Sequence, residues 1–205
     1  LAVFPLAFRA VAGLTKISIL SSDLIQVNLV FMFAGIAGII TSLDNKQLNL
    51  GIINDALPAR AKKIIGPIQT VITVSVISAL FLASFSELFM AFPDGDKLWG
   101  IPLTVIFAAL PFMYFVMIAI PLKRNKSRIS VLIGIAIGLF VASGPIAGIL
   151  YYTFHFENIT FLTNMFNFWM LMAGKLFWPL VVLLILSAVF GAPIFIVLAG
   201  IAYVA

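Results

Sequence analysis

Four long runs without a single charged residue constrain this chain more than any other feature. They cover residues 24–43, 64–86, 98–122 and 129–154. About 20 apolar residues in a helix cross the roughly 30 Å hydrocarbon core of a bilayer, so each run has the length of a membrane span. Only helices and closed barrels satisfy their backbone in lipid, and the runs lack the alternation of barrel strands. The sequence therefore predicts an all-α fold, a polytopic bundle of transmembrane helices.

Two further apolar runs flank these four, at residues 1–14 and 176–205. The first has the length of a truncated span. The second contains Gly191 and Pro193, and because proline removes a backbone donor, we expect the helix to kink or break near Gly191. Pro179 is expected in the first turn of this last helix. The sequence thus predicts about six apolar segments, and since the chain begins and ends within apolar stretches, we expect it to be part of a longer polypeptide.

Basic residues are concentrated in two alternate loops between the apolar runs. The two groups are Lys46, Arg60, Lys62 and Lys63, and Lys123, Arg124, Lys126 and Arg128. Loops rich in lysine and arginine stay on the cytoplasmic side, so we expect a multi-pass protein of the bacterial inner membrane with these loops in the cytoplasm. The basic residues are not interleaved with stacking aromatics, which argues against nucleic-acid binding. Residues 48–57 suit either an amphipathic segment on the inner membrane surface or a cap under the bundle.

The composition argues against a catalytic or metal-binding site. Charged residues make up only 9% of the chain against 63% hydrophobic residues, which is too few to cover a soluble protein, so membrane lipids must surround it. Cysteine is absent, and no nucleophile–base–acid set, glycine-rich phosphate loop or pair of carboxylates is present. We therefore expect no catalytic residue, no metal site and no enzymatic activity.

Three polar residues near the ends of apolar runs are candidates for a functional role. Glu87 is expected as an interfacial carboxylate at the outer end of its span, with a role in an ion pathway as the alternative. Lys175 lies between Trp169 and Trp178, so we expect it to reach the outer interface, with a partner or substrate contact as the alternative. His155 is alone, which favours an exposed loop position over metal binding.

Small residues recur at helix-packing intervals within two of the runs. One set is Ala34 and Gly38, and the other is Gly134, Gly138 and Ala142. Small residues four apart let two helices approach closely in lipid. We expect both sets to lie at helix–helix contacts.

An ordered series of short motifs goes beyond composition. A stretch rich in glycine and alanine at residues 33–38 is followed by Asp44-Asn45-Lys46-Gln47-Leu48 and then by Leu57-Pro58-Ala59-Arg60. This order resembles the small, Q-type membrane subunit of TRAP (tripartite ATP-independent periplasmic) transporters, and Asp23 matches a carboxylate common before that family's second span. Asp44 stands where the family usually has glutamate, and Gln47 where it often has histidine.

The last apolar run carries a second resemblance. Residues 183–195, which include Gly191 and Pro193, are similar to the opening helix of the large, M-type TRAP subunit. The two resemblances together imply a fusion. Residues 1–124 would form a four-helix scaffold domain with a truncated first helix, 125–165 a connecting transmembrane helix and outer loop, and 166–205 the start of the transport domain.

The resemblance implies a permease component that imports an organic acid, either a C4-dicarboxylate or a sialic-acid-like carboxylate. A periplasmic substrate-binding protein would deliver the acid, a sodium gradient would drive its import, and the rest of the large subunit would be the membrane partner. The substrate and sodium sites are expected outside this stretch, no other cofactor is expected, and the chain would act mainly as a scaffold. The alternatives are the small membrane subunit of another tripartite carboxylate transporter, a non-transporting membrane anchor, and an intramembrane enzyme, which would need polar groups within spans.

Overall fold

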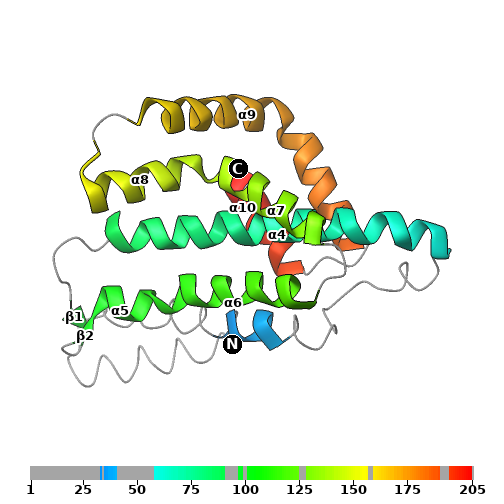
Figure 1. The fold of residues 1–205 in the computed structure, drawn as a ribbon, viewed down its shortest axis with the longest axis horizontal. Helices are drawn as coiled ribbons and strands as arrows, with labels where there is room; N and C mark the ends of the chain where they lie inside the picture. Colours follow the sequence, from blue (N-terminus) through cyan, green and yellow to red (C-terminus); the bar gives the residue numbers. More distant parts are fainter. Residues whose placement is uncertain are drawn as a thin grey trace, which may run out of the picture.

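Long apolar helices lying side by side make up the structure, a computed structural model that describes residues 33, 35–40, 58–90, 97–98, 101–124, 128–156, 159–189 and 194–204 (Figure 1). The helices are α4 (Ala59–Met90), α5 (Leu103–Phe107), α6 (Ala109–Arg124), α7 (Arg128–Val141), α8 (Ser143–Phe154), α9 (Thr160–Val189) and α10 (Ile194–Val204). Two short strands, β1 (Lys97–Leu98) and β2 (Ile101–Pro102), pair antiparallel, with Leu98 opposite Ile101. The fold is an all-α membrane helix bundle, as predicted.

Helix α4 is the centre of the bundle. It packs against α6 on one side and against α7 and α8 on the other, and α10 also contacts it (Figure 1). Its inward side chains include Val74 and Ile77, which are buried, and Ile77 packs with the buried Met117 of α6. Helices α6, α7 and α8 are therefore positioned by one central helix, while α9 packs mainly on α8 and α10.

Three helical segments of the described residues are long and apolar enough to cross a membrane: Lys63–Met90, Leu103–Lys123 and Thr160–Val189. The pair α7 and α8 adds a fourth if it is counted as one bent span. The predicted run at residues 1–14 and most of that at 24–43 lie outside the described residues. The total of about six segments therefore stays a prediction.

The run at residues 129–154 is not the single straight helix that the sequence predicted. It forms α7 and α8, which meet at a 66° bend, and Ala142 between them has φ −88° and ψ 20°. Pro145 explains the break, because it has no N–H to donate to the carbonyl of Val141 one turn earlier. The run is therefore a pair of helices joined at a sharp bend, and we call this pair the broken span.

The third predicted run, at residues 98–122, becomes helical later than expected. Leu98 and Ile101 belong to the β1–β2 pair, and the helical span begins at Leu103. Pro102 immediately before it is extended, with φ −57° and ψ 133°. Proline suits this position, because the first helical N–H groups have no intrahelical acceptor.

The last predicted run, at residues 176–205, belongs to two helices, since α9 ends at Val189 and α10 begins at Ile194, on either side of the predicted kink or break. Helix α9 already begins at Thr160, so Pro179 lies inside it and not in a first turn. Figure 1 shows α9 bending between its gold first part and its orange second part, and Pro179 accounts for the bend because it cannot donate to the carbonyl of Lys175. The kink expected at Gly191 and Pro193 lies outside the described residues.

Candidate functional site

The closest helix contact in the described bundle is the seam between α4 and α7. A Cβ atom built on Gly134 would lie 2.9 Å from the carbonyl oxygen of Val71, and one on Gly138 would lie 2.8 Å from that of Ser75. Real Cβ atoms essentially never come so close to other atoms, so α7 lies directly on the backbone of α4. The prediction that Gly134 and Gly138 mark a helix contact is confirmed, and we call this contact the α4–α7 seam.

The same close packing continues beyond the bend into α8. A Cβ atom on Gly148 would meet Ser86 Oγ of α4 at 3.0 Å, and one on Gly144 would meet the ring of Phe166 of α9 at 2.6 Å. Ala142 and Ser143, at the bend itself, are completely buried. Because both halves of the broken span are held against neighbours, α4, α7 and α8 form a rigid unit.

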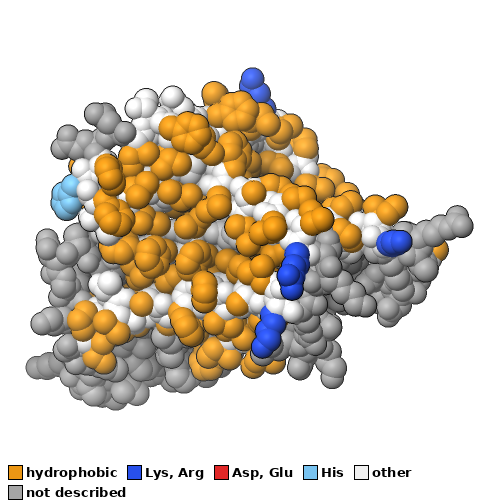
Figure 2. Space-filling view, viewed as in Figure 1, with side chains coloured by type: hydrophobic (Ala, Val, Ile, Leu, Met, Phe, Trp, Pro, Cys, Tyr) orange, Lys and Arg blue, Asp and Glu red, His pale blue; other side chains and the backbone are white. Residues whose placement is uncertain are grey.

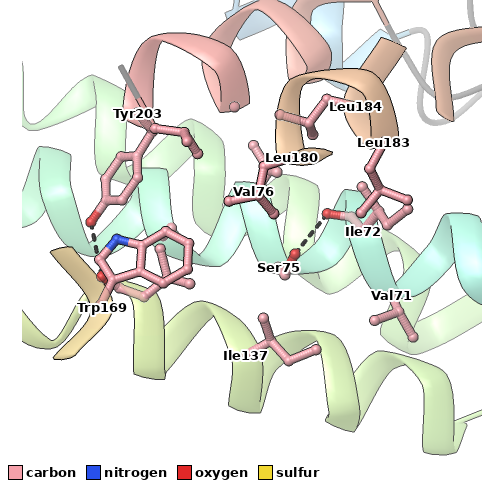
Figure 3. A pocket seen from close by; sticks show the side chains of 14 residues that line it. Val71, Ile72, Ser75, Val76, Ile137, Trp169, Leu180, Leu183, Leu184 and Tyr203 are labelled. Atoms are coloured by element: carbon pink, nitrogen blue, oxygen red, sulfur yellow. Dashed lines mark hydrogen bonds between the residues drawn. The ribbon is translucent and has the colours of Figure 1, made fainter. Parts of the chain in front are cut away.

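An apolar cavity of about 210 Å³ lies beside the seam, between α4, α7, α9 and α10 (Figure 3). Its lining consists of Val71, Ile72, Ser75, Val76, Ala79, Ile137, Val141, Trp169, Leu180, Leu183, Leu184, Gly200, Tyr203 and Val204. Aliphatic side chains dominate this wall. None of these lining residues carries a charge, so the cavity offers no cationic group for the carboxylate of an organic acid.

The two hydroxyl groups of the cavity wall already have partners within the protein. Ser75 Oγ donates to the carbonyl oxygen of Ile72 at 2.9 Å, and Tyr203 Oη donates to that of Val141 at 3.3 Å (Figure 3). Val141 is the residue whose carbonyl loses its helical donor to Pro145. Tyr203, from α10, therefore supplies the hydrogen bond that the broken span lacks, which lowers the cost of an unpaired carbonyl in lipid.

The role of Tyr203 was not predicted from the sequence. Pro145 was a visible signal for a broken helix in the run at 129–154, but the donor that compensates for it lies 62 residues from Val141 along the chain. No local pattern links the two residues.

The predicted family-signature residues are only partly within the described structure. Pro58 is exposed directly before α4, and Arg60 belongs to the first turn of that helix. The structure therefore brings these two together at one end of the central helix. The others lie outside the described residues: Asp23, Asp44, Lys46, Gln47, Gly191 and Pro193.

Apart from Lys175, the charged side chains of the described residues lie near the ends of helices. Lys63, Lys123 and Arg128 lie where α4 and α7 begin and α6 ends, and Figure 2 shows basic side chains on that side. His155 lies at the opposite edge, exposed and with a left-handed φ of 53° at the end of α8. Glu87 is exposed in the last turn of α4. His155 is thus exposed after the end of its helix, as predicted, and Glu87 lies at the end of its helix, whereas its interfacial position stays a prediction.

Lys175 lies near the middle of α9 and is exposed, because this helix begins at Thr160, before the charge-free run that follows Lys175. That Lys175 reaches the outer interface stays a prediction.

Comparison with known proteins places the chain in a family. Residues 6–130 match the family model of the DctQ component of tripartite ATP-independent periplasmic transporters, which is more than half of the chain. The chain belongs to the DctQ family. No curated protein and no solved structure matches it.

The DctQ match confirms the resemblance to the small TRAP subunit, and it makes the chain a membrane component of a TRAP transporter. DctQ components work with a periplasmic binding protein and with a large TRAP subunit. The matched range contains α4, α5 and α6 and ends at the start of α7. Helix α4 is therefore the DctQ element on which the later helices pack.

Proposed function

We propose that this chain is the scaffold part of a TRAP permease that imports an organic acid, a C4-dicarboxylate or a sialic-acid-like carboxylate, across the bacterial inner membrane. A periplasmic binding protein delivers the acid, and a sodium gradient drives its import. The observation that carries this proposal is the DctQ match over residues 6–130. The permease acts as a transporter and not as an enzyme.

The packing of the described helices supports a scaffold role. A scaffold has to keep its shape while another part of the transporter moves, and the α4–α7 seam leaves no space for the two helices to slide. The cavity beside it has an uncharged, largely aliphatic wall whose hydroxyl groups are already hydrogen-bonded. We therefore place the substrate and sodium sites in the large transport part.

We also propose a division of the chain into three parts. Residues 1–124 form the DctQ scaffold domain, 125–165 a connecting transmembrane segment with an outer loop, and 166–205 the start of a fused large-subunit domain. Helix α9 passes residue 166 without a break, so this last change of domain would occur within one helix. Reading the coding sequence past Ala205 tests this: several hundred further apolar residues support the fusion, and an early stop contradicts it.

Deletion of the gene is the direct test of transport. Uptake of labelled sialic acids and C4-dicarboxylates is measured in the deletion strain, in the same strain with the gene restored, and with sodium replaced by potassium. We expect loss of uptake for one acid, recovery on complementation and no uptake without sodium. Uptake of an unrelated neutral solute controls for membrane integrity. Unchanged uptake across a panel of organic acids would contradict the proposal.

Calorimetry on the purified chain tests the scaffold assignment separately. We expect no heat of binding from sodium or from the acid identified by the uptake assay, because no charged side chain faces the described cavity. Saturable binding of either ligand would place a transport site within this chain and overturn the scaffold role.

A further inference from the structure

The cavity beside the α4–α7 seam lies on the inner side of the bend in α9. Trp169 lines the cavity before the bend at Pro179, and Leu180, Leu183 and Leu184 line it after the bend. The two parts of α9 therefore face the same space, whose other walls come from α4, α7 and α10 (Figure 3).

The cavity is open between α7 and α9. At one end these helices are in contact, since the rings of Phe140 and Trp169 meet edge to face with their centroids 6.3 Å apart. Farther along, Ile137 of α7 and Leu183 of α9 line the cavity and are also 42% and 46% exposed. Because Ile137 and Leu183 are both exposed and part of the wall, they form its rim.

The rim adjoins lipid. The α4 and α7 residues of the wall all belong to the charge-free runs 64–86 and 129–154, which a membrane helix bundle exposes to lipid where protein does not cover them. The neighbouring exposed side chains are apolar as well, for example Ile133 one turn before Ile137 and Leu186 one turn after Leu183. Hydrocarbon chains are therefore the nearest molecules outside the described rim.

The wall suits a hydrocarbon guest better than a polar one. It carries no charge, and both of its hydroxyl groups, on Ser75 and Tyr203, are already hydrogen-bonded to backbone carbonyls. A buried water molecule needs about two to four polar partners, whereas an apolar cavity of roughly 150 Å³ stays dry and takes up benzene. At about 210 Å³, this cavity has room for a guest larger than benzene.

Packing also favours an occupied cavity. Side chains around an empty space lose the dispersion contacts that close packing provides. Closing the space by protein movement would require α9 to shift, but Leu184 and Ala188 of α9 are packed against Val197 of α10. A flexible chain from the adjoining lipid fills the space without moving any helix.

We propose that the cavity is a binding site for one acyl chain of a membrane phospholipid, which enters between Ile137 and Leu183. The acyl chain fills the inner side of the α9 bend and contacts α4, α7, α9 and α10 together. Helix α4 lies within the DctQ match, whereas α9 and α10 lie beyond it, so the lipid joins the DctQ part to the later helices. This site depends on helix packing and not on the proposed transport function.

Fluorescence quenching by brominated lipid tests the site, because Trp169 is part of the wall. The chain has three tryptophans, so Trp99→Phe together with Trp178→Phe leaves Trp169 alone. This protein is reconstituted in vesicles of phosphatidylethanolamine and phosphatidylglycerol, with plain or with brominated acyl chains. Bromine quenches tryptophan only at close range, so the loss of emission in brominated vesicles reports an acyl chain next to Trp169.

Two substitutions close the site in this background. Ile137→Phe enlarges an exposed side chain of the rim, and Ser75→Leu fills the cavity from α4. Leu132→Phe is the matched control, since Leu132 is exposed on α7 and is not part of the wall. We expect each closing substitution to lower the quenching of Trp169 at least two-fold and Leu132→Phe to leave it unchanged. Circular dichroism verifies that each variant keeps its helix content.

A second single-tryptophan protein, which keeps the exposed Trp178 instead, reports the surrounding lipid. Its quenching should be the same with and without the closing substitutions. Equal quenching of Trp169 in all variants would mean that this ring meets lipid only outside the cavity, and it would overturn the proposal. Absence of quenching at Trp169, as expected if water or a protein segment fills the cavity, would also overturn it. Uptake plays no part in this assay, so these results are separate from the test of transport.

Discussion

Replacement of Gly138 by alanine should separate α7 from α4. The added Cβ would lie 2.6 Å from the Cβ of Ser78 and 2.8 Å from the carbonyl oxygen of Ser75, whereas ordinary contact begins at 3.4 Å. The carbonyl belongs to the helix backbone and cannot rotate away, so the two helices have to move apart. Overpacking of this kind costs about 1–3 kcal/mol.

The same substitution also has a favourable effect on the helix. Alanine stabilises a helix interior by about 0.5–1 kcal/mol relative to glycine, so the net loss for Gly138→Ala should be about 0–2.5 kcal/mol, with a central value near 1 kcal/mol. Gly174→Ala is the matched control, because Gly174 lies inside α9 with no atom within 4 Å of its added Cβ. There only the favourable effect remains, and we expect a gain of about 0.5–1 kcal/mol.

Unfolding by sodium dodecyl sulfate in mixed micelles measures both variants. Helix content from circular dichroism gives the unfolding free energy of each variant relative to wild type, with tryptophan fluorescence as a second probe. We expect Gly138→Ala to unfold at lower detergent fraction than wild type and Gly174→Ala at equal or higher fraction. Equal shifts in the same direction would refute the close contact at the α4–α7 seam.

Two further substitutions test the packing of the bundle by the same unfolding assay. Tyr203→Phe removes the hydrogen bond to Val141 and should lower the free energy of unfolding by about 0.5–1.5 kcal/mol. The control Tyr151→Phe, on an exposed tyrosine, should change it by almost nothing. Equal effects would mean that the hydrogen bond adds no stability. Met117→Ala removes a side chain that is 1% exposed and should cost about 2 kcal/mol, the lower end of the range for soluble cores, because lipid contributes no hydrophobic driving force. Met170→Ala, on a side chain 57% exposed, should be close to neutral, and a loss as large as that of Met117→Ala would contradict the burial pattern.

The class of the fold could be predicted because one physical constraint dominates it. A charge-free run long enough to cross a bilayer has to be helical, and this reasoning found the helical spans around Val74 and Met117. The contact at Gly134 and Gly138 was also predictable, because small residues spaced four apart in a membrane helix allow a second helix to approach closely. These predictions needed only local sequence.

The broken span shows where local sequence stops being sufficient. Pro145 permits a bend but does not require one of 66°, and the conformation is completed by Tyr203 from a distant helix. Helix α9 is a second case, because a charge-free run beginning at residue 176 does not indicate that the helix starts at Thr160 and includes Lys175.

The resemblance to the small TRAP subunit rested on motifs that lie mostly outside the described residues. Pro58 and Arg60 are placed at the start of α4, and the DctQ match supports the family independently of their geometry. The fusion boundary, the substrate and the coupling ion stay predictions. No local pattern within this sequence identifies them.

The hydrogen bond from Tyr203 to Val141 has a consequence for how the protein is made. The bend between α7 and α8 emerges from the ribosome 62 residues before the tyrosine that completes it. During that interval the Val141 carbonyl has neither its helical donor nor its final partner, so it has to remain in contact with water or the insertion machinery. The broken span therefore gains this hydrogen bond only after α10 has been synthesised.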